Sequence, residues 1–244
     1  MKKPSVRNTP SILTMAIGAF LLSANLCLAV VISPAERNEK LLGYNEAYES
    51  LTEVCLESDA EKISAAWKEA KTQRTEIVAF LDEAGVKKFD EILGVAGQAY
   101  KQKKHTELSL AAVELYKFIV LACDASILEV PASVHLMDYA GFRNKALMQK
   151  QPVDWQALTD NSKYARLEWQ KVSGRVTDQA LLKSVDQAIE AMIKGANDHD
   201  INLEKSATES ELALVDELEK NLKGKKTDTP AATEQKVSGK TGVK

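Results

Sequence analysis

The chain has 244 residues, with 32 Lys and Arg side chains against 35 Asp and Glu side chains and a net charge of −3. This balance argues against nucleic acid as a partner, because nucleic-acid-binding proteins need a concentrated basic surface to neutralise phosphates. Glycine (11) and proline (6) are scarce, while the helix formers Ala, Leu, Glu and Lys are abundant. The composition therefore predicts an all-α protein.

The N-terminal segment has the pattern of an export signal. Three basic residues precede an apolar run over residues 12–32, which is the order of the basic and hydrophobic regions of a signal peptide. Small residues at Cys27 and Ala29 predict cleavage after Ala29, which removes residues 1–29. The remaining chain has 29 basic and 35 acidic side chains, a net charge of −6. We therefore expect a periplasmic or secreted protein.

Two other fates of this segment are considered. The 21 residues from Ile12 to Ile32 reach roughly 31 Å as a helix, which is enough to cross a bilayer as an uncleaved anchor. Lipid modification of Cys27 is disfavoured, because the residue before such a cysteine is normally small and here it is Leu26. An anchor leaves the body outside the cytoplasm, at the inner membrane. Membrane contact is expected only in that case.

Residues 35–222 have the periodicity of packed helices. Apolar residues recur at alternating spacings of three and four, as expected for one buried face of a helix. Gly85 and Gly174 are suitable helix ends. The clearest stripes are Leu41, Tyr44, Tyr48, Leu51 and Cys55, then Trp155, Leu158, Ser162, Ala165, Trp169 and Val172, then Leu181, Val185, Ala188, Met192 and Ala196.

Several helix starts are expected from capping patterns. Ser58 with Glu61, and Thr208 with Glu211, have the spacing of a capping box. Asp154 is a suitable N-cap for the helix that follows it. Each of these positions precedes a run of helical periodicity, so we expect a helix to begin there.

The predicted fold is an antiparallel, up-and-down bundle of about five to seven helices, because no strand-like alternation occurs. Residues 108–121 are apolar nearly all round, which predicts a central helix. The pattern stops at residue 223. Residues 223–244 contain six lysines and two acids with no large core residues, which predicts a disordered tail.

Cleavage of the signal leaves two cysteines, Cys55 and Cys123, in a compartment that permits a disulfide. If residues 86–123 form one long helix, the two cysteines lie at the same end of the bundle. If the chain breaks near His105, they lie at opposite ends. The simpler interpretation is a pair of buried free thiols. The absence of Cys-x-x-Cys-His and Cys-x-x-Cys motifs argues against covalent haem.

Glu114 is the most unusual residue of the predicted core. A carboxylate on a helix that is apolar on all sides must be paired, protonated or bound to a cation. Glu107 lies one heptad earlier, and His135 and Asp138 share a face of the following helix. These four residues are candidate ligands for a metal ion held between two helices.

A simpler interpretation of Glu114 needs no metal. In it, the carboxylate pairs with Arg143 or accepts a hydrogen bond from Tyr139, as a satisfied buried polar group. The Glu-x-x-His pairs of di-iron bundles are also absent from the sequence.

Residues 198–209 lie between two predicted helices and resemble the calcium loop of an EF-hand. The oxygen donors at the ligand positions are Asp198, Asp200, Asn202, Ser206 and Glu209. Leu203 stands where the loop needs glycine for its sharp turn, and Lys205 stands where an apolar residue is usual. The simpler interpretation is an acidic connector before a helix capped by Thr208.

Motifs for catalysis are missing. The sequence has no Gly-x-Ser-x-Gly, no phosphate-binding glycine loop, no His-Glu-x-x-His and no dinucleotide fingerprint. The leading prediction is therefore a non-enzymatic exported helical protein, a periplasmic binding or accessory protein for a partner protein or small ligand. One alternative is a bundle that binds calcium or an iron- or copper-type ion, so a divalent metal is the one cofactor considered. The other is a hydrolase whose site assembles from distant residues.

Overall fold

The computed structural model describes residues 32–223, and this part of the chain is helical, without strands. The prediction of an all-α protein is thus confirmed for these residues. The predicted signal peptide, and all of the predicted tail except Lys223, lie outside the described residues. The α-helices are α1 (Pro34–Gly43), α2 (Asn45–Glu57), α3 (Ala60–Thr72), α4 (Arg74–Val78), α5 (Glu83–Lys101), α6 (His105–Ala122), α7 (Ala132–Leu147), α8 (Trp155–Val172), α9 (Gln179–Asp198) and α10 (Ile201–Leu222).

The described residues contain ten α-helices, so the expected number of five to seven is wrong. Short interruptions account for part of the difference. One residue, Tyr44, separates α1 from α2, and one residue, Gln73, separates α3 from α4. The expected single stripe from Leu41 to Cys55 therefore runs over two helices, because a one-residue break barely disturbs the apolar periodicity.

Aspartates cap several of the helices. Asp154 accepts a hydrogen bond from the amide of Ala157, as predicted for the start of α8. Asp59 caps α3 instead of Ser58, whose φ of 59° places it at the end of α2. Gly85 does not end a helix, since it lies in the first turn of α5. The local patterns thus locate these boundaries to within a few residues.

The expected capping box at Thr208 and Glu211 is wrong. Helix α10 begins at Ile201, where the side chain of Asp200 accepts hydrogen bonds from two backbone amides of the first turn. Thr208 and Glu211 lie inside this helix, and both are fully buried. A buried face that happens to carry Thr and Glu three residues apart has the same local sequence as a cap.

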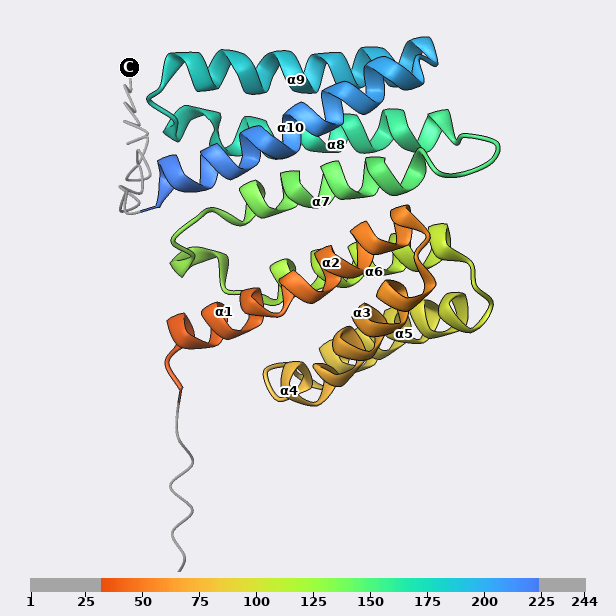
Figure 1. Cartoon of the computed structure of the whole chain (residues 1–244). Coiled ribbons are helices and arrows are strands. Elements are labelled where there is room, and N and C mark those ends of the chain that lie inside the picture. Colours follow the sequence, from red (N-terminus) through yellow and green to blue (C-terminus); the bar gives the residue numbers. More distant parts are fainter. Residues whose placement is uncertain (1–31, 224–244) are drawn as a thin grey trace, which may run out of the picture. The chain divides into compact units, whose positions relative to one another are not determined.

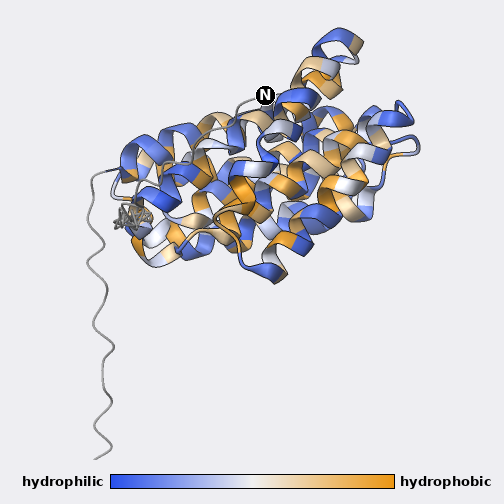
Figure 2. Cartoon of the chain, turned by 90° about the horizontal axis from the view of Figure 1, so that it is seen from below, coloured by the Kyte–Doolittle hydropathy of each residue, from blue (hydrophilic) through white to orange (hydrophobic). Residues whose placement is uncertain are grey.

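Helices α7 to α10 contact one another in a closed ring, in which α10 returns to pack against α7. Figure 1 shows α7 between α10 and the pair formed by α2 and α6. Helix α6 contacts α2, α5 and α7, which agrees with its apolar composition. Apolar residues lie mostly on the inward sides of the helices (Figure 2). None of the helices of residues 32–223 is both long and apolar enough to cross a membrane.

The disulfide alternative is wrong, because Cys55 and Cys123 are both free and buried. The chain breaks between α5 and α6, so α6 runs antiparallel to α2. At one end of this contact the hydroxyl of Ser109 donates to the carbonyl of Thr52, one turn from Cys55. At the other end Cys123 lies beside the carbonyl of Asn38. The two thiols are therefore at opposite ends of the helix pair.

Candidate metal-binding site

Three potential metal ligands meet where α7 packs against the C-terminal part of α10. His135 and Asp138 lie one turn apart on α7, and Glu219 comes from α10. One ligand atom from each residue lies within 4.8 Å of the other two. Nδ1 of His135 is 3.0 Å from Oε1 of Glu219. One imidazole and two carboxylates form a donor set suited to divalent ions of the zinc, manganese and iron type.

A third acidic side chain, that of Glu49, approaches the cluster from α2. Burial, which is the largest cause, and the negative charge of Glu219 raise the pKa of Glu49 to about 7. Burial also raises the pKa of Asp138, and the charges of Glu49 and Glu219 add to this effect. The hydroxyl of Tyr116 lies 3.5 Å from Oδ2 of Asp138. The neighbouring negative charges thus disfavour the charged forms of Glu49 and Asp138, whereas the hydrogen bond with His135 lowers the pKa of Glu219.

The cluster borders a hollow of about 450 Å³ between α1, the segment before α7 and the end of α10. His135 and Glu219 form part of its wall. Glu39 and Glu129 also line it, and Lys223 is the one basic residue there apart from the histidine. A mostly acidic entrance concentrates cations near its walls. The hollow therefore offers a path from solvent to His135 and Glu219.

The two glutamates of α6 do not belong to this cluster. Glu114 accepts hydrogen bonds from Arg143 and from the hydroxyl of Tyr139, the latter at 2.9 Å. The simpler interpretation of Glu114, as a paired carboxylate, is therefore the one the structure shows. Glu107 is exposed and lines a separate shallow hollow between α5 and α6 together with Glu114. Of the four residues first grouped as metal ligands, His135 and Asp138 lie together.

Residues 198–209 do not form a calcium loop. Only His199 and Asp200 separate α9 from α10, and the next residues are helical. His199 takes the positive φ of 57° at this turn. Leu203, at the position where an EF-hand requires glycine, continues the helix instead. The departure from glycine noted in the sequence is thus the physical reason for the difference.

The candidate calcium ligands are spread over the end of α9, the turn and the first turns of α10, and Ser206 donates a hydrogen bond to the carbonyl of Leu203. Asp198 forms an ion pair with Lys194 one turn earlier on α9. Asp200 caps α10 by accepting hydrogen bonds that include the amide of Asn202. Glu209 is exposed on α10. Their oxygen atoms therefore do not surround a common point.

Nothing in the local sequence indicates that Glu49 and Glu219 lie beside His135 and Asp138. Each directly follows a buried apolar residue, Leu218 and Tyr48 respectively. Asp216 follows Val215 in the same way and is exposed. A position beside the apolar stripe is half-buried only if another helix covers it, and this depends on contacts between distant parts of the chain.

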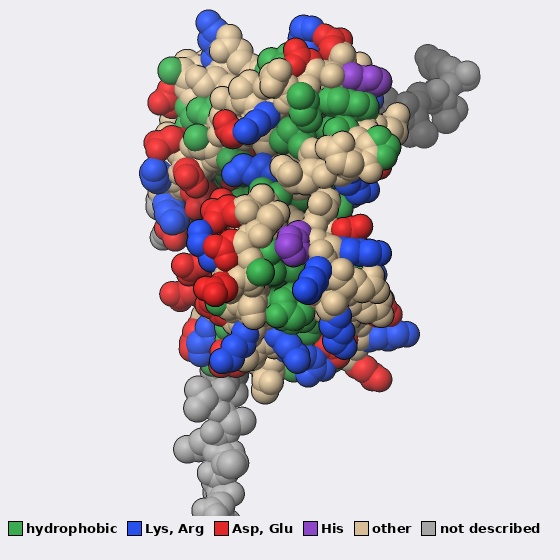
Figure 3. Space-filling model, turned by 45° about the vertical axis from the view of Figure 1, so that its right-hand side comes forward, with side chains coloured by type: hydrophobic (Ala, Val, Ile, Leu, Met, Phe, Trp, Pro, Cys, Tyr) green, Lys and Arg blue, Asp and Glu red, His purple; other side chains and the backbone are tan. Residues whose placement is uncertain are grey.

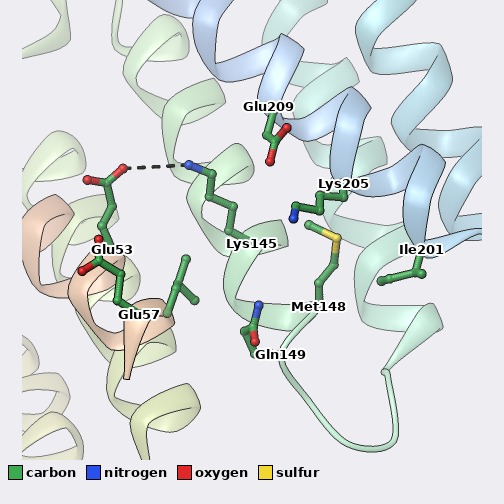
Figure 4. A pocket seen from close by; sticks show the side chains of 9 residues that line it. Glu53, Glu57, Lys145, Met148, Gln149, Ile201, Lys205 and Glu209 are labelled. Atoms are coloured by element: carbon green, nitrogen blue, oxygen red, sulfur yellow. Dashed lines mark ion pairs between the residues drawn. The ribbon is translucent and has the colours of Figure 1, made fainter. Parts of the chain in front are cut away.

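A third hollow, of about 480 Å³, lies at the other end of α7 and α10. Figure 4 shows Glu53 and Glu57 on its α2 side and Lys205 and Glu209 on its α10 side. Nζ of Lys145 lies 3.8 Å from Oε1 of Glu53. Because acidic and basic groups alternate around it, this hollow selects no single class of ligand. On the face drawn in Figure 3, both kinds of charge are likewise present.

Comparisons with known proteins give no family for this chain. No protein-family model matches it. No curated protein and no solved structure matches it either. The function is therefore inferred from the geometry of the cluster at His135.

Proposed function

We propose that this protein is an exported, non-enzymatic helical-bundle protein that binds a divalent metal ion through His135, Asp138 and Glu219. The observation that carries the proposal is the approach of one imidazole and two carboxylates, from two helices, to within 4.8 Å of one another. Three protein ligands of this kind are a common minimum for a bound transition-metal ion. Glu49 is the candidate for a fourth ligand.

The charges around the cluster support a cation. Glu49, Asp138 and Glu219 are acidic, and His135 is the one Lys, Arg or His side chain of the described residues that lies within 4.0 Å of any of their carboxylates. Half-buried carboxylates without a compensating charge are costly. A divalent ion offsets this charge, and the imidazole of His135 would bind it in the neutral form that metal ligation needs.

The packing of α7 and α10 holds the residues of the proposed site in place. His135 and Asp138 lie on a helix that packs on α2, α6, α8 and α10. Glu219 lies on α10 between Leu218 and Leu222, which are fully buried in the core shared with α7. Ligands on packed helices are held in place before the ion binds, which lowers the entropic cost of binding.

The test is metal analysis and calorimetric titration of the purified mature protein with Zn²⁺, Mn²⁺ and Ca²⁺. We expect saturable binding, and at least tenfold weaker binding in Asp138→Asn and Glu219→Gln. Glu217→Gln is the matched control, because Glu217 is an exposed glutamate on the same helix. The absence of binding in the unaltered protein, or equal losses in Glu217→Gln and Glu219→Gln, would contradict the proposal.

Export is tested separately by mass spectrometry of the protein isolated from its own cells. We expect an N-terminus directly after Ala29 and recovery in the periplasmic or secreted fraction. A chain that retains residues 1–29 in the cytoplasmic fraction would contradict the proposed location. An uncleaved chain in the membrane fraction would identify residues 12–32 as an anchor.

A further inference from the structure

A line of buried polar groups continues from Asp138 along the contact between α7 and α10. Gly141 lies one turn after Asp138 on α7, and Glu211 lies opposite it on α10. Farther along, Asn144 of α7 donates a hydrogen bond of 2.7 Å to Oε1 of Glu204. The proposed metal site thus lies at the outer end of a row of acidic residues, Asp138, Glu211 and Glu204, which we call the acidic seam.

Glu211 is the unexplained residue of this seam. Its side chain has no solvent exposure, and neither carboxylate oxygen has a hydrogen-bond partner. By contrast, Oε1 of Glu204 is hydrogen-bonded to Asn144. A buried carboxylate with two unpartnered oxygens is strongly unfavourable unless something binds to it. The packing of the helices alone therefore gives no reason for an acid at this position.

The surroundings of Glu211 place its carboxyl group against α7 at Gly141, one helical turn after Asp138. A Cβ atom at Gly141 would lie 2.6 Å from Oε2 of Glu211, so this glycine leaves the room that the carboxylate occupies. Burial raises the pKa of Glu211, and the charge of Asp138 raises it further. Asp138 and Gly141 are three residues apart and share a face of α7, so the carboxyl groups of Glu211 and Asp138 lie in the same contact between α7 and α10.

We propose that Glu211 and Asp138 hold a second, inner divalent cation, with Asp138 shared between the two ions. This inference rests on the proposed function, because Asp138 is also a ligand of the outer ion. Glu49, Asp138, Glu211 and Glu219 together carry four negative charges when ionised. One divalent ion leaves half of this charge uncompensated, whereas two ions neutralise it, which matters because charge in the interior is costly.

The donor atoms indicate which ions suit each position. The outer position includes the imidazole of His135, which suits zinc, manganese and iron. The inner position would have the carboxylate oxygens of Glu211 and Asp138, and the buried hydroxyl of Thr208 lies one turn earlier on α10. An all-oxygen set favours hard ions such as Mg²⁺, Mn²⁺ and Ca²⁺. Mn²⁺ suits both positions and is therefore the probe of choice.

The competing explanation is that Glu211 is simply a neutral, protonated acid. Glu211→Gln distinguishes the two, because glutamine keeps the shape and hydrogen-bonding capacity of the protonated acid but is a poor metal ligand. If the acid is only neutral, the substitution leaves metal binding unchanged. If it binds an ion, the substitution removes one ion per chain.

The experiment counts Mn²⁺ ions per chain by metal analysis and calorimetry, and uses electron paramagnetic resonance to detect magnetic coupling between two ions. For the mature protein we expect two ions and a coupled signal. In Glu211→Gln we expect one ion, an uncoupled signal and an outer affinity within about tenfold of the original. Glu209→Gln, an exposed glutamate two residues away, should keep both ions and the coupling.

Each outcome separates this inference from the proposed function. One uncoupled ion in the unaltered protein would overturn the inner site and leave the outer site standing. Two ions in Glu211→Gln would also overturn it, whereas no binding at all would overturn both proposals. If Glu211→Gln fails to fold, as judged by circular dichroism, the ion count and coupling of the unaltered protein decide the question.

Discussion

The side-chain amide of Asn144 on α7 donates a 2.7 Å hydrogen bond to Oε1 of Glu204 on α10, although the two residues are 60 positions apart in sequence. Asn161 of α8 donates in turn to Oδ1 of Asn144, also at 2.7 Å. Asn144 and Glu204 are fully buried. This chain of hydrogen bonds links three helices through polar groups inside an otherwise apolar core.

The first prediction concerns Asn144→Ala, which removes one hydrogen-bond partner from each of two buried polar side chains, Glu204 and Asn161. We expect the free energy of unfolding, measured with urea, to fall by about 2–4 kcal/mol. Asn202→Ala, at an exposed position on α10, should change it by less than about 0.5 kcal/mol. Equal effects of the two substitutions would show that the buried network contributes no stability.

The second prediction concerns pH. Burial raises the pKa of Glu204 from 4.5 to about 7, and its neighbours Asn144 and Ser162 are neutral. The folded chain therefore binds this proton more tightly than the unfolded chain. Glu204 therefore contributes up to about 3 kcal/mol to the free energy of unfolding below pH 4.5. This contribution is lost as the pH rises through 7.

Glu204→Gln tests this, because glutamine stays neutral throughout that range. The loss of unfolding free energy between pH 4.5 and pH 8 should be smaller in this variant than in the unaltered protein. Glu209→Gln, which alters an exposed glutamate, should keep the original pH dependence. Identical pH profiles for Glu204→Gln and the unaltered protein would mean that Glu204 is already ionised at low pH.

The helices could be predicted from the sequence because apolar spacing is a local property. The start of α10 could not, because Thr208 and Glu211 form the same local pattern whether they cap a helix or lie buried within one. The distinction comes from the packing of α10 on α7, at Gly141, where the two helices approach closely. The local sequence around Thr208 and Glu211 does not indicate that contact.

The residues of the candidate site likewise fall into those that the sequence predicts and those that it does not. His135 and Asp138 could be paired from the sequence, because residues three apart share a face of a helix. Glu219 joins them from α10 and Glu49 from α2, and no local pattern connects these helices. Glu114 was correctly recognised as needing a partner, and Arg143 and Tyr139 provide it.

The third prediction concerns the close approach at Gly141. A Cβ atom there would lie 2.5 Å from Cδ2 of Leu212 and 2.6 Å from Oε2 of Glu211. Gly141→Ala should therefore separate α7 from α10 and lower the unfolding free energy by about 1–3 kcal/mol. Gly94→Ala is the control, because no atom lies within 4 Å of its added Cβ. It should raise stability by about 0.5–1 kcal/mol, so a gain from both substitutions would contradict the predicted clash.

The fourth prediction concerns the two thiols in an oxidising compartment. Burial raises the pKa of Cys55 to about 12 and that of Cys123 to about 11, so neither thiol supplies much of the reactive thiolate. Both should react with a thiol reagent only after unfolding. The unfolding midpoint should be the same with and without reductant, since a disulfide closing a loop of this length contributes about 4 kcal/mol. A midpoint that falls on reduction would show that the cysteines bond after all, and would require α2 and α6 to pack in a different register.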